Sequence, residues 1–132
     1  MPIHRLAFMI PATLLGGCST MPSGPEAGTS NLNHVVLISL ENKSDAEACA
    51  ADCRSMLGTI ESVDTLWVGT PVDTGRERVD DDYQVGLCVG FENREDLQTY
   101  LDDPSHIELV ESWGPRATRF RIFDVGQPGL NR

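Results

Sequence analysis

The stretch Tyr83-Gln-Val-Gly-Leu-Cys-Val-Gly-Phe-Glu-Asn93 decides the fold, because it predicts a strand, its buried face and the next helix start. Apolar side chains recur at every second position up to Phe91, which is the period of a strand with one buried face. Gly86 and Gly90 fall on the other face and leave a shallow surface for another backbone to approach. Asn93 then caps a helix that we expect to run to about Asp102.

Further along the chain, Asp103-Pro104 predicts a second helix start, with the aspartate as N-cap and proline at the first helical position. This helix carries Ile107, Val110 and Trp113 and ends at Gly114-Pro115. A last strand is expected over residues 119–125, and residues 126–132 form a frayed tail.

Towards the N-terminus, residues 34–40 are nearly all apolar and predict a strand buried on both faces. Ser44 and Glu47 have the spacing of a capping box, with Ser44 as N-cap. The helix that follows ends near Gly58. A strand over residues 63–72 and a polar loop over residues 73–82 come next. The apolar face of the helix consists of Ala46, Cys49, Ala50, Cys53, Leu57 and Ile60.

The order of elements is β-α-β-β-α-(α)-β, which predicts an α+β domain of the ferredoxin-like kind. Its four-stranded antiparallel sheet carries the helices on one face. The other face needs a cover, and in a chain of this length we expect a second copy. The expected assembly is therefore a homodimer through the sheet face, a dimeric α/β barrel.

The N-terminal residues predict export. Arg5 precedes an apolar run from Leu6 to Leu15. That run is too short to span a bilayer, which takes about 20 apolar residues, and it has the layout of a signal peptide over residues 1–17. Leu15-Gly-Gly-Cys18 resembles the bacterial lipobox, so Cys18 is the expected lipidation site. Residues 18–33 then form a flexible linker, and Ser19 favours the outer membrane. We expect a protein of the bacterial cell envelope, lipid-anchored and facing the periplasm.

Charge and cysteine content exclude some functions. The 132 residues carry 20 acidic and 10 basic side chains, a formal net charge of −10, which disfavours nucleic acid as a partner. Cys49 and Cys53 are expected to be buried free thiols, a strained bridge within the helix being less favoured. Cys88 falls on the glycine face of its strand, where a symmetric bridge between two copies is conceivable. We expect no metal site and no cofactor, and we interpret the aspartates at positions 80–82 as a solvated loop.

Several of these segments together resemble the stress-responsive A/B barrel (Dabb) family. The resemblance spans about residues 34–125, and its most specific part is Tyr100-Leu-Asp-Asp-Pro-Ser-His106. The family's usual His-Pro-x-His reads Asp103-Pro-Ser-His106 here, so its first histidine is absent. The resemblance implies a dimeric α+β barrel, and for most members no assigned activity.

The resemblance also implies a set of site residues. In plant polyketide cyclases of this fold, of the olivetolic acid cyclase type, a histidine and a tyrosine catalyse an aldol condensation. By motif these match His106 and Tyr100, and His34 matches a histidine at the start of the first strand. Cys49 and Cys53 stand where those cyclases have larger side chains, so a ligand pocket would differ in shape. The expected ligand-binding residues are His34, Cys49, Cys53, Leu87 and Val89.

The chemistry of the pair is consistent with this. The positive end of the helix begun at Asp103 disfavours imidazolium, so His106 is expected to be a neutral base. Tyr100 lies six residues earlier, and only the helix break allows both side chains to converge.

Three functions remain open from the sequence. The first is a non-enzymatic homodimeric module that binds a small apolar ligand or takes part in a stress response. The second is a cofactor-free enzyme of the dimeric-barrel type, a cyclase or monooxygenase using His106 and Tyr100. The third is a module that binds another envelope protein through its sheet or acidic loops.

Overall fold

The computed structural model describes residues 30–130. The expected signal peptide, the lipidation site Cys18 and most of the linker lie outside the described residues. Four strands, three α-helices and two short 3-10 turns follow one another. They are β1 (Leu32–Leu40), η1 (Lys43–Asp45), α1 (Ala46–Leu57), β2 (Thr65–Gly69), β3 (Val85–Phe91), α2 (Arg94–Asp102), α3 (Pro104–Trp113), η2 (Gly114–Arg116) and β4 (Ala117–Gly126).

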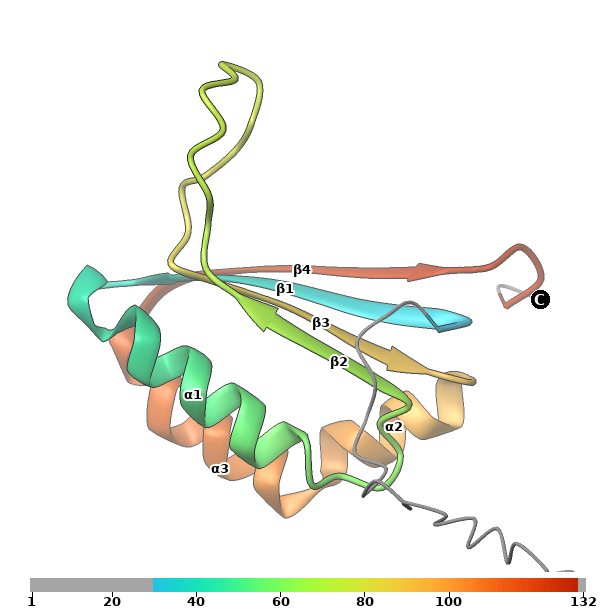
Figure 1. Ribbon diagram of the computed structural model, residues 1–132. Coiled ribbons are helices and arrows are strands. Elements are labelled where there is room, and N and C mark those ends of the chain that lie inside the picture. The colour runs from blue at the N-terminus through green and yellow to red at the C-terminus, as the bar shows by residue number, and fades with distance from the viewer. Residues whose placement is uncertain (1–29, 131–132) are drawn as a thin grey trace, which may run out of the picture.

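The four strands form one antiparallel sheet in the order β2-β3-β1-β4. All three α-helices lie on the same side of this sheet (Figure 1). The predicted α+β class, the order of elements and the placement of the helices on one face are therefore confirmed. We call the side without helices the open face.

Strand β1 differs from the prediction in two ways. It begins at Leu32 rather than His34, so the last two residues assigned to the linker belong to the sheet. Its side chains alternate between buried and partly buried along the whole strand, so it is not buried on both faces. The reason is that helices cover only one side of the sheet, and Val35 and Leu37 point to the open face.

Two of the three predicted helix starts are confirmed. The side chain of Asn93 accepts a hydrogen bond from the backbone N–H of Asp96 at 2.9 Å. Asp103 accepts one from Ser105 at 2.8 Å. The capping box at Ser44 is wrong, because Asn42 caps the turn instead by accepting the Ser44 N–H at 3.2 Å. This contact starts η1 and moves the beginning of α1 to Ala46.

The core lies between the sheet and the helices. The alternation predicted for β3 is confirmed from Val85 onward, since Val85, Leu87, Val89 and Phe91 are all at most 4% exposed. Tyr83, where the strand was predicted to begin, lies before β3 and packs over Gly86 instead. Helix α1 buries the face that the sequence predicted, although Ile60 lies beyond its end. Helix α3 buries Leu109 and Trp113, whereas Ile107 and Val110 remain 44% and 48% exposed. Trp113 also donates its indole N–H to Asp52 of α1 at 3.0 Å, which ties the two helices together.

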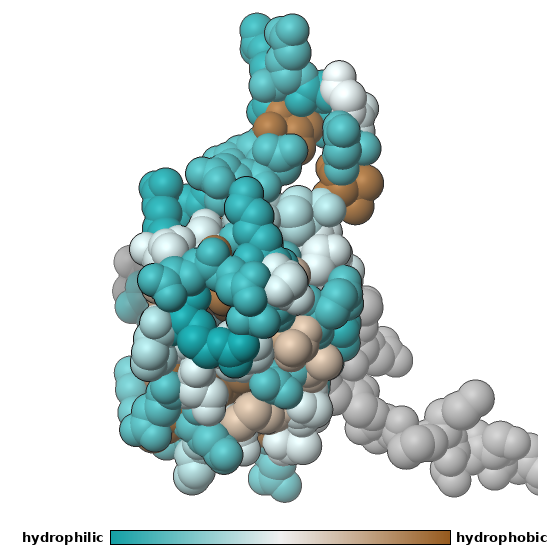
Figure 2. Space-filling view, turned by 90° about the vertical axis from the view of Figure 1, so that its left-hand side faces the viewer, coloured by the Kyte–Doolittle hydropathy of each residue, from teal (hydrophilic) through white to brown (hydrophobic). Residues whose placement is uncertain are grey.

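Strand β2 is shorter than predicted, because the chain leaves the sheet after Gly69. Residues 70–84, which we call the arm, have no regular structure and project from the open side of the sheet (Figure 1). Figure 2 shows the arm standing out from the body with a mostly hydrophilic surface. Asp80 pairs with Arg121 of β4, which holds the pKa of this carboxyl below its ordinary value. The base of the arm is thereby fixed to the sheet.

The surface at the two glycines of β3 is not free for another backbone. A side chain at Gly90 would overlap the hydroxyls of Ser30 and Thr65, and Gly86 lies under Tyr83 and Leu37. The open face is therefore filled by side chains of the same chain at both positions. The tail is also not frayed up to residue 130, because the Gln127 N–H donates to the carbonyl of Asn31 at 2.9 Å.

Candidate functional site

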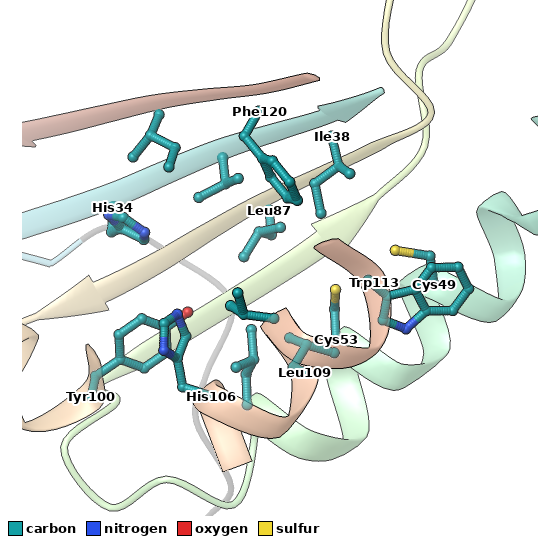
Figure 3. Close-up of a pocket in the computed structure, with 14 residues that line it drawn as sticks. His34, Ile38, Cys49, Cys53, Leu87, Tyr100, His106, Leu109, Trp113 and Phe120 are labelled. Carbon is teal, nitrogen blue, oxygen red and sulfur yellow. The ribbon is translucent and has the colours of Figure 1, made fainter. Parts of the chain in front are cut away.

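A cavity of about 90 Å³ lies between the sheet and helices α1 and α3 (Figure 3). Its wall is almost wholly apolar. The polar side chains gather at one end, beside Tyr100, and two thiols line the wall formed by α1. The lining residues are His34, Val36, Ile38, Cys49, Cys53, Leu57, Leu87, Tyr100, His106, Leu109, Val110, Trp113, Phe120 and Ile122.

The mouth of the cavity lies at the edge strand β4. Phe120 and Ile122 of β4 are 41% and 55% exposed although they face the helix side. They are exposed because the helices cover the central strands and leave this edge free. Val110 of α3 adds an exposed apolar side chain to the same opening.

Tyr100 lies between two histidines. Its ring centroid is 4.5 Å from that of His106 and 5.9 Å from that of His34. Asp103 has an extended conformation between α2 and α3, so the chain changes direction there and brings Tyr100 and His106 together. The sequence-predicted pair therefore converges on one cavity, as Figure 3 shows.

The two histidines carry their ring protons on defined atoms. Nδ1 of His106 lies 3.1 Å from the carbonyl oxygen of Leu101, which can only accept a hydrogen bond. Nδ1 of His34 lies 2.6 Å from a carboxylate oxygen of Asp124. Both Nδ1 atoms therefore donate, and in the neutral rings the Nε2 atoms are the proton acceptors.

Burial affects the protonation of His106 and Tyr100. It lowers the pKa of His106 below its ordinary value, which favours the neutral imidazole. Burial also raises the pKa of Tyr100 far above its ordinary value, so its phenol keeps its proton. The cavity thus presents a phenolic donor beside a neutral base, an arrangement that can move a proton next to a carbonyl group and donate to the oxygen.

Asp124 was not predicted as a site residue. Asp124 reaches the site because the register of the sheet places it on β4 directly opposite His34 of β1. The sequence signal is its place two residues after Ile122 in an alternating strand. Six of the seven predicted site residues line the cavity, namely His34, Cys49, Cys53, Leu87, Tyr100 and His106, whereas Val89 does not. Val89 is fully buried in the core beside them.

Other expected features lie elsewhere. Cys88 is a free, partly buried thiol on the open face, and burial raises its pKa. Among residues 30–130, no three His, Cys, Asp or Glu side chains are grouped so as to hold a metal ion. In the same part of the chain, no helix has the length and hydropathy needed to cross a membrane.

The fold and the cavity define a class of protein, a ferredoxin-like α+β domain with an apolar pocket between its sheet and its helices. Residues 32–126 match the model of the stress responsive A/B barrel domain, Dabb. The chain belongs to this family, as the sequence resemblance indicated. No curated protein matches its sequence.

Solved structures share the fold. A Dabb family protein with a ferredoxin-like fold from Mesorhizobium loti is 22% identical with a TM-score of 0.63, over 74% of this chain and 97% of that one. A dimeric ferredoxin-like protein of unknown function from Thermobifida fusca is 11% identical with a TM-score of 0.62, over 73% and 90%. The hydroxynitrile lyase of Passiflora edulis is 13% identical with a TM-score of 0.63, over 74% and 94%. At these identities the likeness concerns the fold alone.

Proposed function

We propose that this protein is a homodimeric module of the bacterial cell envelope that binds a small apolar or aromatic ligand. The observation that carries the proposal is the apolar cavity with one polar end, formed by Tyr100, His34 and His106. Ligand sites commonly combine apolar walls with a few convergent polar groups.

The size of the cavity limits what enters. At about 90 Å³ it is smaller than the roughly 150 Å³ apolar cavity that accepts benzene. A short chain or part of a ring fits inside, and the rest of a larger ligand would lie in the mouth against Val110, Phe120 and Ile122.

The open face supports the homodimer. Trp67, Cys88, Val35 and Phe123 stand opposite one another across all four strands, and we call this set the apolar row. Trp67 and Phe123 are 52% and 51% exposed in the single chain. Several related structures, including the one from Thermobifida fusca, are described as dimeric. A second copy of the same face would bury the row.

The envelope location rests on the sequence before residue 30. Leu15-Gly-Gly-Cys18 after a short apolar run supports lipidation of Cys18, and Ser19 supports the outer membrane. The acyl chains would hold the domain at the membrane behind a short linker.

A second function is favoured by the His34–Asp124 contact. A carboxylate that holds the Nδ1 proton of a histidine leaves its Nε2 as a base of fixed orientation. With Tyr100 beside it, the cavity would support cofactor-free chemistry such as an aldol condensation or a monooxygenation. In this case His34→Ala, which removes this base, would abolish turnover while ligand binding persists.

Native mass spectrometry of the full chain purified from membranes tests the main proposal. We expect the mass of a dimer, acyl chains on Cys18 and a co-purifying small molecule. Val110→Trp places a large ring at the mouth and should reduce the bound fraction at least tenfold. Ile107→Trp is the matched control, since Ile107 has similar exposure on the same helix and does not line the cavity.

Two results would contradict this function. One is equal loss of ligand in both tryptophan variants, which would mean that the cavity is not the site. The other is a purified protein that carries no co-purifying ligand and has no affinity for small aromatic probes.

A further inference from the structure

Two thiols lie side by side in the wall of the cavity. Cys49 and Cys53 are 0% and 1% exposed, both are free, and both line the cavity. Figure 3 shows their sulfur atoms on the side of α1 that faces the sheet. Both side chains therefore face the cavity that opens at β4.

Their spacing brings the two sulfur atoms within reach of one bound atom. Residues four apart on a helix have Cβ atoms about 5–6 Å apart. The two thiols interact closely enough that each shifts the pKa of the other, lowering that of Cys49 and raising that of Cys53. A disulfide between such positions is strained, because this separation is beyond the usual Cβ distance of about 3.8 Å. The pair is better suited to hold an atom between its sulfurs than to form a bridge.

The residues around the two thiols determine which kind of atom can bind between their sulfurs. Leu57, Leu87 and Leu109 line the cavity around the thiols, so a product with a net charge would be costly there. Thiolates prefer soft metals and metalloids. Tetrahedral zinc needs four ligands, which the described residues around this pair do not supply.

We propose that Cys49 and Cys53 form a two-thiol site that binds a soft, thiophilic atom in a complex with no net charge. A trivalent organoarsenical meets these requirements best. An arsenic atom with one carbon substituent and two hydroxyls exchanges both hydroxyls for the two sulfurs. Two As–S bonds form, two As–O bonds break, and the thiol protons leave with the hydroxyls as two water molecules. No oxidation state changes, and the organic group occupies the apolar cavity.

This site shares the cavity with the proposed function but needs neither the homodimer nor the histidines. Its test can therefore fail independently. Phenylarsine oxide is a suitable probe, because it carries one aromatic ring and reacts with paired thiols.

The experiment uses the full chain with Cys18→Ser and Cys88→Ser, so that the pair supplies the only thiols. We expect intact mass spectrometry to show one phenylarsenic group per folded chain, retained against a monothiol and released by a dithiol. Bound probe should also raise the midpoint of thermal unfolding. In that background, Cys49→Ala or Cys53→Ala should abolish retention against the monothiol.

The matched control restores Cys88 in the Cys49→Ala chain, which again has two thiols but places them on opposite faces of the sheet. Retention by this control, or by both single alanine variants, would overturn the site. So would a folded parent chain that captures no arsenic, or captures it only in denaturant. If one alanine variant does not unfold cooperatively, its serine counterpart replaces it. Capture by a chain that binds no other apolar molecule would contradict the proposed function and leave this site standing.

Discussion

At the scale of single residues, the Tyr100–His106 pair was predictable and the His34–Asp124 pair was not. Tyr100 and His106 are six residues apart with a helix break between them, so local sequence limits where both can point. His34 and Asp124 are 90 residues apart. Their contact depends on the register of β1 against β4, and a shift by one residue would move Asp124 to the open face.

His106 gives the first prediction at this scale. Its folded-state pKa lies below the ordinary value of 6.5, so in acid the unfolded chain binds more protons at this residue than the folded chain does. The stability that this residue contributes is therefore full above about pH 6.5 and is lost as the pH falls below it. Urea unfolding between pH 7.5 and 5 should show a steeper loss for the wild type than for His106→Gln.

The comparison of the two chains cancels the other titrating groups, which are the same in both. Parallel pH profiles for the wild type and His106→Gln would show that His106 is not held neutral by burial.

At the scale of elements, helix starts were predictable where the sequence offers only one candidate for the N-cap. Asn93 and Asp103 each have no rival, and both predictions are confirmed. At Ser44 the prediction is wrong because Asn42 caps a preceding 3-10 turn and accepts hydrogen bonds from both the backbone N–H and the hydroxyl of Ser44. The extent of β2 was unpredictable for a different reason, since it ends where its partner β3 begins rather than at any residue of its own.

Alanine substitutions at two glycines, one crowded and one not, give a prediction about stability with its own control. At Gly90 of β3 a methyl group would overlap the hydroxyls of Ser30 and Thr65 and disturb their hydrogen bond. Gly90→Ala should therefore destabilise the fold by about 1–3 kcal/mol, the usual cost of overpacking. At Gly114 no atom lies within 4 Å of the added methyl group and the backbone is helical. Gly114→Ala should leave the unfolding midpoint in urea unchanged or higher.

An equal loss of stability in both glycine variants would show that the contacts of Ser30 and Thr65 do not restrict Gly90.

At the scale of the whole molecule, the layout of one sheet with helices on one side followed from the order of elements. The arm did not, because a polar loop of 15 residues has no pattern that fixes its direction. Its base is set by Arg121 and Asp80, which are 41 residues apart in the chain. The cavity itself could not be predicted from local sequence either, since six separate elements supply its wall.

The proposed homodimer gives the prediction at this scale. A carboxylate at either end of the apolar row, where Trp67 and Phe123 stand, would be buried against the second copy without a partner. Trp67→Asp and Phe123→Asp should each shift the sedimenting species from dimer to monomer, with at least a tenfold weaker association. Val72→Asp is the control, because Val72 is 70% exposed and lies in the arm, outside the apolar row.

A dimer that persists in both aspartate variants would place the interface away from the open face. A monomeric wild type at micromolar concentration would contradict the homodimer itself.

The length and edge position of strand β4 bear on how the protein resists aggregation. It is ten residues long, lies at an edge of the sheet, and carries exposed apolar side chains on both faces. Such an edge is a template for endless stacking of strands into fibrils. Arg119, Arg121 and Asp124 interrupt the apolar residues of this strand. In a parallel, in-register stack each of these charges would face its own copy, so the strand carries its own protection against fibril growth.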